Sequence, residues 1–187
     1  MSNFPAAGVY SIDPVHSTFT FVARHLVVSK VRGRFAEFDG TVTVGDSPET
    51  SSAVVTVQAG SITTDNAMRD GHIKSNDFLA QETYPTLTFK STSLTPKDEN
   101  QYALVGDLTI RDVTKSVTFN VEFLGTGPST VPGASVIGFE GTTEIDRRDF
   151  NVNFEGALEN GAVAVSHKIV IEIAVEAAST VPAEASN

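Results

Sequence analysis

The chain contains no cysteine and no tryptophan, and its basic residues are few. The absence of cysteine excludes disulfide bonds and any metal or redox centre built on thiolates. With 13 Lys and Arg residues against 23 Asp and Glu residues, the net charge is −10, which disfavours binding to nucleic acids and to acidic membrane surfaces. No apolar run approaches the length of a membrane-spanning helix, and no signal peptide is visible before Tyr10. We therefore expect a soluble, cytoplasmic protein without a transmembrane segment.

What the sequence does contain is strict alternation of apolar and polar residues, the pattern of half-buried β-strands. About eight such runs follow one another between turn-rich loops. The run at 34–44 is out of phase at Phe35, which we interpret as a bulge. The final run, 162–176, is long and β-branched and is suited to pairing with the first. Because a closed sheet has no exposed edges, the sequence predicts one all-β domain over 9–176, an eight-stranded antiparallel β-barrel with flexible termini at 1–8 and 177–187.

The segment 64–79 departs from this alternation. Its apolar residues have a roughly helical spacing, at Met68, Ile73, Phe78 and Leu79. We expect Thr64 or Asp65 to cap the helix start through a side-chain oxygen. Gly71 weakens a helix by roughly 1 kcal/mol relative to alanine, which favours two short turns over one longer helix. The segment is predicted to be a short helical insert that caps one end of the barrel and carries polar groups to its mouth.

The inward-facing rows are rich in Phe, Val, Ile and Leu, with Gly or Ala between them, and Gly33 and Gly106 relieve crowding within their strands. These rows either fill a solid core or surround a cavity for a long, flexible apolar chain. Each buried methylene of such a guest would gain about 0.8 kcal/mol before ordering costs. We predict contacts with the apolar tail of a ligand from nine inward-facing side chains: Phe19, Phe21, Phe38, Val42, Val55, Phe89, Leu104, Phe119 and Phe139.

Polar residues of the insert are the candidates for contact with a ligand head group. Arg69 is favoured because a guanidinium offers a fixed fork of donors, and His72 lies one turn further on; Asp70 is interpreted as structural. His25, in phase with the inward row of its strand, and Phe78 complete the predicted site. The run 147–149, Arg-Arg-Asp, is ambiguous between an ion pair and a head-group contact.

The sequence carries no motif for metal binding or catalysis. Its four histidines are scattered, at His16, His25, His72 and His167, so we expect no metal ion and no other cofactor. Ser17 follows His16 directly, and adjacent strand residues point to opposite faces, which argues against a nucleophile–base pair. No nucleophile elbow, phosphate-binding loop or dinucleotide fingerprint is present, so we predict no catalytic residues.

Short motifs follow one another in a fixed order from Val9 to Glu176. They are Tyr10-x-Ile-Asp-x-x-His16-Ser17, Phe21-x-x-x-His25-Leu26, Val31-x-Gly33-x-Phe35, Ser61-Ile-x-Thr64, Arg69-Asp70-x-His72, Tyr84-Pro85-x-x-x-Phe89, Gly106-Asp107-Leu108-Thr109-Ile110 and Arg148-Asp149-Phe150. This ordered set resembles the YceI-like family. Asp112 and Asn151 stand where the family usually has Gly, and both residue types tolerate left-handed backbone angles.

The resemblance implies an extended lipocalin-like barrel whose long apolar cavity holds a polyisoprenoid or similar amphiphilic lipid, often in a homodimer. It also implies that the helical segment lies beside the cavity and that the protein binds lipid without catalysis. Many members are exported to the periplasm, a location that does not carry over to this sequence. Our interpretation is a non-catalytic binder that transports, stores or sequesters a long-chain polyisoprenoid or quinone-like lipid. The alternatives are an enzyme acting on such a lipid through His16, His25 or His72, and a filled barrel acting as a stress or partner-binding protein.

Overall fold

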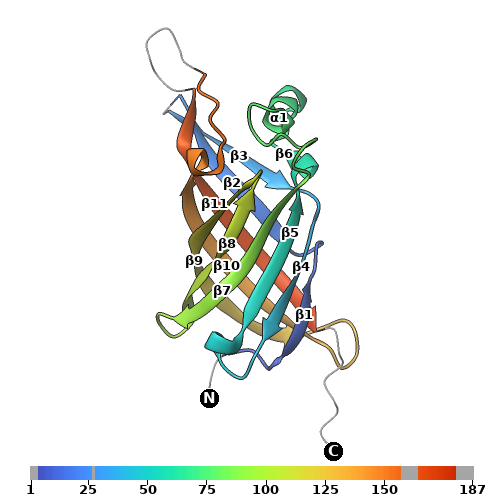
Figure 1. Cartoon of the computed structure of the whole chain (residues 1–187). Helices are drawn as coiled ribbons and strands as arrows, with labels where there is room; N and C mark the ends of the chain where they lie inside the picture. The colour runs from blue at the N-terminus through green and yellow to red at the C-terminus, as the bar shows by residue number, and fades with distance from the viewer. Residues whose placement is uncertain (1–3, 27, 157–163, 180–187) are drawn as a thin grey trace, which may run out of the picture.

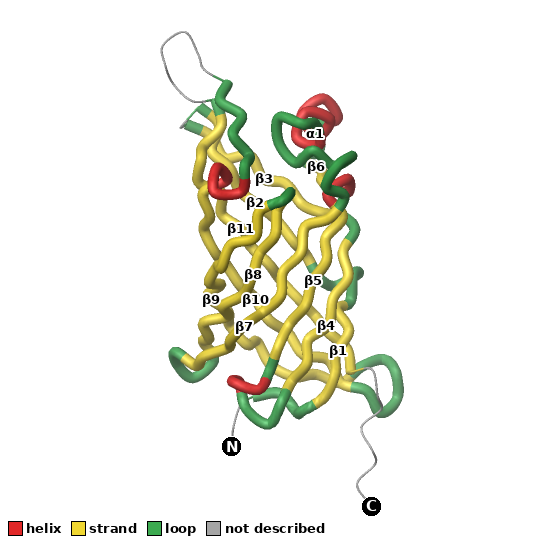
Figure 2. Tube along the Cα trace, in the orientation of Figure 1, coloured by secondary structure: helices red, strands yellow, loops and turns green. Residues whose placement is uncertain are grey.

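The computed structural model describes residues 4–26, 28–156 and 164–179, in which all the strands form one antiparallel sheet that closes into a barrel (Figure 1). The strands are β1 (Gly8–Ile12), β2 (Thr18–His25), β3 (Ser29–Phe35), β4 (Phe38–Val44), β5 (Ser52–Gln58), β6 (Ile62–Thr63), β7 (Thr86–Pro96), β8 (Gln101–Ile110), β9 (Val113–Pro128), β10 (Ser135–Asp146) and β11 (Val165–Ser179). One α-helix, α1 (Ala67–Lys74), and three 3₁₀ turns, η1 (Pro48–Thr50), η2 (Ala59–Ser61) and η3 (Arg147–Phe150), complete the described chain. Figure 2 shows that these short helices lie at the two ends of the barrel. No helix in the described ranges is long and apolar enough to cross a membrane.

The eleven strands occupy eight positions around the wall, because three positions hold two strands in line. Strand β11 pairs with β2 over most of its length and with β1 near its end, where Ala177 faces Ile12. The next two positions around the wall are each shared by two strands in the same way. In the first of them, β4 pairs with β1 and β3 pairs with β2. In the second, β5 pairs with β4 and β6 pairs with β3. The eight-stranded antiparallel barrel predicted from the sequence, and its closure by the last strand against the first, are confirmed.

A break between β3 and β4 corrects the prediction of one bulged strand over 34–44. Phe35 ends β3 and Phe38 begins β4, so Phe35 is out of phase because the chain leaves the strand at Ala36 and Glu37. Their peptide groups bond to the η2 turn and its neighbour instead: the Ala36 N–H donates to Ser61 O, and Glu37 O accepts from the Gln58 N–H. These bonds satisfy backbone groups that the strand ladder leaves free.

Helix α1 differs from its prediction at its start and in its middle. Its N-cap is Asn66, whose Oδ1 accepts the Arg69 N–H at 3.0 Å, because Thr64 is committed to Asp70 and Asp65 has a left-handed φ of 59°. The helix runs through Gly71, so the prediction of two short turns is wrong. A Cβ at Gly71 would meet no atom within 4 Å, so this glycine carries only its intrinsic cost, which does not end the helix.

The two turns that depart from the family pattern show where left-handed backbone is needed. In the β8–β9 hairpin the positive φ, 58°, falls on Arg111 and not on Asp112. Asn151 follows η3 with a φ of 59°, as its residue type allows. Arg111 is fixed by donating to the carbonyls of Phe78 and Asn151, and its guanidinium lies 5.6 Å from the centre of the Tyr84 ring.

The wall is not hydrogen-bonded over its whole height. Strand β7 pairs with β5 and β8, but within the described residues it does not pair with β6. The segment 64–85, which contains α1, leads the chain from β6 to β7 and lies at one end of the barrel, the α1 end (Figure 1). Side chains and turns, not a strand ladder, therefore form this part of the rim.

Candidate functional site

The barrel encloses a cavity of about 820 Å³ that runs along its interior. Its wall is made mostly of Phe, Val, Ile and Leu side chains from the inward faces of the strands. On β11, for example, Ile169, Ile171, Ile173 and Val175 all line it. A volume of this size lies in the upper part of the range of small-molecule sites. The interior is therefore hollow, as one of the two interpretations of the inward rows predicted.

Twelve of the thirteen predicted site residues line this cavity. They are Phe19, Phe21, His25, Val42, Val55, Arg69, His72, Phe78, Phe89, Leu104, Phe119 and Phe139. Phe38 does not line it; its ring packs on Phe19, with ring centroids 4.5 Å apart. It shares the inward phase of Val42 and Val44 on β4, but it packs against the buried cluster that contains Phe19 and not on the cavity.

Two glycines leave room for aromatic rings against the wall. A Cβ on Gly33 would lie 2.4 Å from Cε1 and Cζ of Phe21, and a Cβ on Gly106 would lie 2.4 Å from Cζ of Phe89. Phe21 and Phe89 therefore lie close over the backbone of the neighbouring strand. Both glycines relieve crowding as predicted, and the rings they accommodate belong to the cavity lining.

The end of the barrel away from α1 is closely packed. Five residues with exposed fractions of 6% or less lie there and do not line the cavity: Tyr10, Tyr102, Phe123, Ile137 and Ala177. Phe4, ahead of β1, places its ring centroid 5.9 Å from that of Tyr102 and also lines the cavity. Residues 4–8 of the expected flexible leader thus include a packed phenylalanine, while residues 1–3 and 180–187 lie outside the described ranges.

At the opposite end, Thr64 anchors α1 to the rim. Arg69 donates from Nε to Thr64 Oγ1 at 2.7 Å and from Nη2 to Thr64 O at 2.9 Å. Asp70 accepts from the Thr64 N–H at 2.7 Å, from Thr64 Oγ1 and from Thr63 Oγ1. Partial burial raises the pKa of Asp70, but these hydrogen bonds outweigh it and hold the pKa below its ordinary value. Asp70 is structural, as predicted, while Arg69 is both anchored and part of the cavity lining.

An aromatic cluster joins α1 to the segment after η3. The His72 ring lies edge-on to Phe78, with centroids 5.1 Å apart, and edge-on to Phe154, at 4.9 Å. Phe78 and Phe154 are also 4.9 Å apart, and all three side chains line the cavity. His72 Nε2 is held 2.8 Å from Asp77 Oδ2. This cluster forms an apolar wall at the mouth with one imidazole in it.

Arg147 is a cavity-lining residue that the sequence left ambiguous. It is 4% exposed and donates to three backbone carbonyls, Val152 O, Val165 O and Ser166 O. Burial lowers its pKa, against the opposing effect of the nearby carboxylates. These bonds tie the η3 turn and the chain after it to β11.

The alternation within β10 separates the two neighbouring arginines. Ile145 faces the cavity and so does Arg147, two residues on, whereas Arg148 turns outward and pairs with Asp146, Nη2 to Oδ2 at 2.6 Å. That bond to Arg148 holds the pKa of Asp146 far below its ordinary value. Continuing the alternation of β10 by one step past its end would have identified Arg147 from the sequence.

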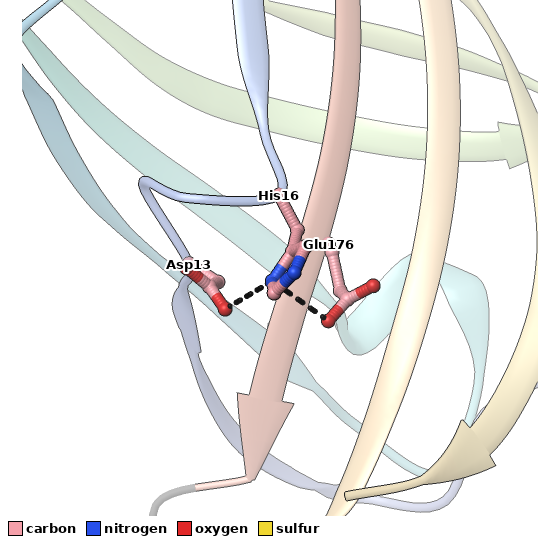
Figure 3. A group of neighbouring side chains, drawn as sticks. All are labelled: Asp13, His16 and Glu176. Atoms are coloured by element: carbon pink, nitrogen blue, oxygen red, sulfur yellow. Dashed lines mark hydrogen bonds and ion pairs between the residues drawn. The ribbon is translucent and has the colours of Figure 1, made fainter.

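Asp13, His16 and Glu176 meet outside the cavity, at the seam where β1 and β2 adjoin β11 (Figure 3). His16 Nδ1 lies 2.8 Å from Asp13 Oδ2 and 3.7 Å from Glu176 Oε1. The hydrogen bond to Asp13 raises the pKa of His16, and the same bond lowers the pKa of Asp13. The three ligand atoms all lie within 4.8 Å of one another, a convergence that spacing along the chain did not reveal. As it stands, the group is an exposed ion-pair network that fastens the β1–β2 connection to β11.

The histidines proposed for a catalytic alternative are not brought together. His16 is outside the cavity, and His25 and His72 line it from different elements. Ser17 Oγ donates to Glu176 O and accepts from the Glu176 N–H, so this hydroxyl is engaged with backbone and not with His16.

Comparison with known proteins places the chain among close relatives. A sequence profile of the YceI-like domain matches residues 10–177. UPF0312 protein SA2479 of Staphylococcus aureus (strain N315) is 38% identical over 169 residues, which span 89% of this chain and 95% of that protein. The crystal structure of the Campylobacter jejuni YCEI protein superposes with a TM-score of 0.72 at 28% identity, covering 84% of this chain and 90% of the other. A polyisoprenoid binding domain from Saccharophagus degradans has the same fold, with a TM-score of 0.68 at 14% identity, covering 91% of this chain and 98% of that domain.

Proposed function

Because the chain belongs to the YceI-like domain family, we propose that its barrel binds one long-chain isoprenoid lipid without catalysis. The lipid tail lies in the 820 Å³ cavity and the head group lies at the α1 end. The protein thereby keeps a poorly soluble molecule out of water for transport, storage or sequestration.

The single observation that carries this proposal is a large cavity with an almost wholly apolar wall. An apolar chain gains about 0.8 kcal/mol for each buried methylene, and the apolar lining offers that gain to the part of an isoprenoid tail that the cavity encloses. The structural neighbour from Saccharophagus degradans, whose fold is shared, is described as a polyisoprenoid binding domain. The shared fold and the apolar hollow support the same class of ligand.

The two alternatives find less support. A solid barrel acting only through its outer surface does not accord with the cavity. An enzyme would require a polar group aimed at a reacting atom beside an acid or base. The two cavity histidines instead lie apart, His25 on β2 and His72 on α1, where its ring packs between Phe78 and Phe154.

Native mass spectrometry of the protein purified from a bacterial host under non-denaturing conditions tests the proposal. We expect an added mass that dissociates as an isoprenoid lipid. Protein stripped of lipid should regain the ligand when a long-chain isoprenol is supplied.

The absence of tryptophan allows a second, matched test. Leu104→Trp places the only indole of the chain in the cavity. Added isoprenol should change the fluorescence emission of this indole, and the bulk of the indole should weaken isoprenol binding. Val54→Trp places the indole outside, on a side chain that is 48% exposed, and should report no change. Protein that never carries a lipid, together with unchanged emission from the Leu104→Trp variant at saturating isoprenol, would contradict the proposal.

A further inference from the structure

Building on the proposed function, we propose that the α1 end of the barrel docks on an anionic lipid bilayer, from which the cavity receives its lipid. Basic side chains on the outer face of β2 and β3 contact the lipid head groups, and two exposed apolar side chains enter the layer beneath them. We call this surface the docking rim, and its residues are Arg24, Val28, Lys30, Arg32, Arg34 and Met68. The purpose of docking rests on the proposed function, whereas docking itself can be measured without any isoprenoid.

The first observation is the distribution of charge along the chain. Residues 18–35, which include β2 and β3, contain four of the 13 basic residues and none of the 23 acidic residues. The net charge of −10 disfavours an anionic membrane for the chain as a whole. An exposed charge, however, acts over only about 10 Å at 0.1 M salt. The local sign of the charge therefore decides whether this part of the surface attracts an anionic bilayer.

The second observation is that these four cations share the outer face of the wall. Arg24 and Lys30 are direct partners across β2 and β3. Arg32 and Arg34 follow on the same face of β3, because residues two apart in a strand point the same way. Arg24, Lys30 and Arg32 line a groove on the outer wall, and all four residues are exposed. Together they form one continuous row of positive charge.

Most of this charge has no counterion. Like charges directly opposite each other on a sheet are destabilising, so the pairing of Arg24 with Lys30 carries a cost. Arg32 pairs with Glu172 at 2.7 Å, and the other two carboxylates of the groove are paired with other cations. Within the described chain, no salt bridge includes Arg24, Lys30 or Arg34. The excess positive charge is therefore available to anionic head groups.

The third observation is that β3 borders the wall at the mouth of the cavity. On one side β3 pairs with β2 along its whole length. On its other side, among the described residues, it pairs only at Arg34 and Phe35, with β6. Figure 1 shows β3 running across the α1 end of the barrel toward β6. Ser29 and Phe35, at the two ends of β3, both line the cavity, so the row of cations lies along the mouth.

Two exposed apolar side chains accompany this row at the α1 end. Val28, directly before β3, is 84% exposed, and Met68 on α1 is 87% exposed and also lines the cavity. Basic residues beside exposed apolar ones are the combination by which proteins lie on anionic membrane surfaces. An acidic protein surface would satisfy the charges alone, whereas a bilayer offers anionic head groups and an apolar layer together.

The opposite end of the barrel has the opposite sign. The turns 45–51 and 97–100 lie at the end away from α1 (Figure 1). They carry four acidic residues, Asp46, Glu49, Asp98 and Glu99, and one basic residue, Lys97. An anionic surface therefore repels this end and attracts the docking rim. The charge distribution orients the mouth of the cavity toward the bilayer.

Vesicle flotation with lipid-free protein tests the docking rim. Vesicles of phosphatidylcholine alone are compared with vesicles of equal parts phosphatidylcholine and phosphatidylglycerol. We expect binding to the anionic vesicles only, and weaker binding as salt is raised. Each basic residue near an anionic surface contributes about fivefold to partitioning, so Lys30→Gln/Arg34→Gln should lose about thirtyfold. The control Lys90→Gln/Lys97→Gln removes the same charge from β7 and the turn after it, and should lose little.

A pair of tryptophan variants locates the part that enters the bilayer. Val28→Trp places the only indole of the chain on the docking rim, where anionic vesicles should shift its emission to the blue and brominated lipids should quench it. Val15→Trp places the indole in the β1–β2 connection, at a position that is 81% exposed, and should show neither effect. Circular dichroism of each variant confirms that the barrel is folded.

The outcomes separate docking from the proposed function. Equal losses in the two double variants, or no binding to anionic vesicles at low salt, would overturn the docking rim. Unquenched emission from vesicle-bound Val28→Trp would overturn it as well. Without vesicles, Lys30→Gln/Arg34→Gln should bind isoprenol as the unaltered protein does, so docking can fail while the proposed function stands. Unaltered protein that binds anionic vesicles but no isoprenol would overturn the proposed function and leave docking in place.

Discussion

Phe123 and Phe139 offer a direct test of whether the interior is hollow. They face each other on β9 and β10, and their ring centroids are 5.2 Å apart. Phe123 is 3% exposed and belongs to the packed end of the barrel. Phe139 packs against the same cluster on one side but lines the cavity on the other. The two rings therefore differ chiefly in what lies beyond them.

Replacing each ring by alanine should have unequal effects on stability. For a fully packed phenylalanine, the lost transfer free energy and the new cavity together cost about 3–5 kcal/mol, which we expect for Phe123→Ala. Phe139 has packing partners on one side only, so its replacement loses about half of the contacts that a fully packed phenylalanine would lose. Phe139→Ala should therefore cost about 2 kcal/mol of stability.

The same pair should affect binding in the opposite order. A phenylalanine buries at least about 150 Å² in full, so one ring face against a ligand contributes roughly 50 Å². At about 25 cal/mol per Å² this is close to 1.3 kcal/mol, or nearly tenfold in Kd. Phe139→Ala should therefore weaken isoprenoid binding nearly tenfold, and Phe123→Ala should weaken it less.

Urea denaturation followed by far-ultraviolet circular dichroism measures the stabilities, since the chain has no tryptophan to report unfolding. Lipid-free protein must be used, because bound ligand stabilises the folded state and would obscure the difference. If Phe139→Ala lost as much stability as Phe123→Ala and bound ligand normally, atoms would have to fill the space beyond Phe139. The reasoning from a hollow barrel would then be refuted.

Three further predictions concern groups that fasten the rim and the seam. Arg147→Met should destabilise the protein by about 3 kcal/mol or more in thermal unfolding, because one buried and two partly buried carbonyls lose their donor. The exposed Arg148→Met should cost less than about 1 kcal/mol, and equal losses for the two variants would contradict this. Asn66→Ala should cost about 1 kcal/mol and speed amide exchange in α1, and Asn66→Asp should preserve both; unchanged exchange would refute the cap. His16→Gln should lower stability most between the ordinary pKa values of Asp13 and His16, 3.8 and 6.5. The difference should fade as pH rises through the raised pKa of His16 or falls through the lowered pKa of Asp13, and denaturation curves that differ equally at all pH values would exclude the ion pair.

Periodicity identified the barrel because each strand has one face toward the interior. A two-residue period assigns that face without knowledge of the partner strand, so Phe19, Phe89 and Phe119 were placed correctly. At Phe38 the same rule gave the inward face but not the contact, because this ring packs against the buried cluster and on Phe19 and does not line the cavity.

Local propensity was a poorer guide at the helix. Gly71 marks a weak point in an isolated helix, but its outward position and the anchoring of α1 by Thr64 decide the outcome. Asn66 is the N-cap because Thr64 is hydrogen-bonded to Asp70 and Arg69 of the same segment, a competition that cap preferences alone do not show. Side-chain partners brought together from separate elements, such as those of Arg147, likewise depend on the closed fold.

The interval between β6 and β7 has a consequence for how the barrel could open at its rim. Everywhere else in the described barrel, widening the circumference would part backbone ladders, whereas here only α1 and its flanking turns span the gap. Moving that segment away from the barrel would break the bonds of Asp70 and Arg69 to Thr63 and Thr64, the bond from Arg111 to Phe78 O and the ring contacts with Phe154, but it would leave the neighbouring strands paired. Within the described wall, this segment is therefore the part whose displacement would disrupt no strand pairing.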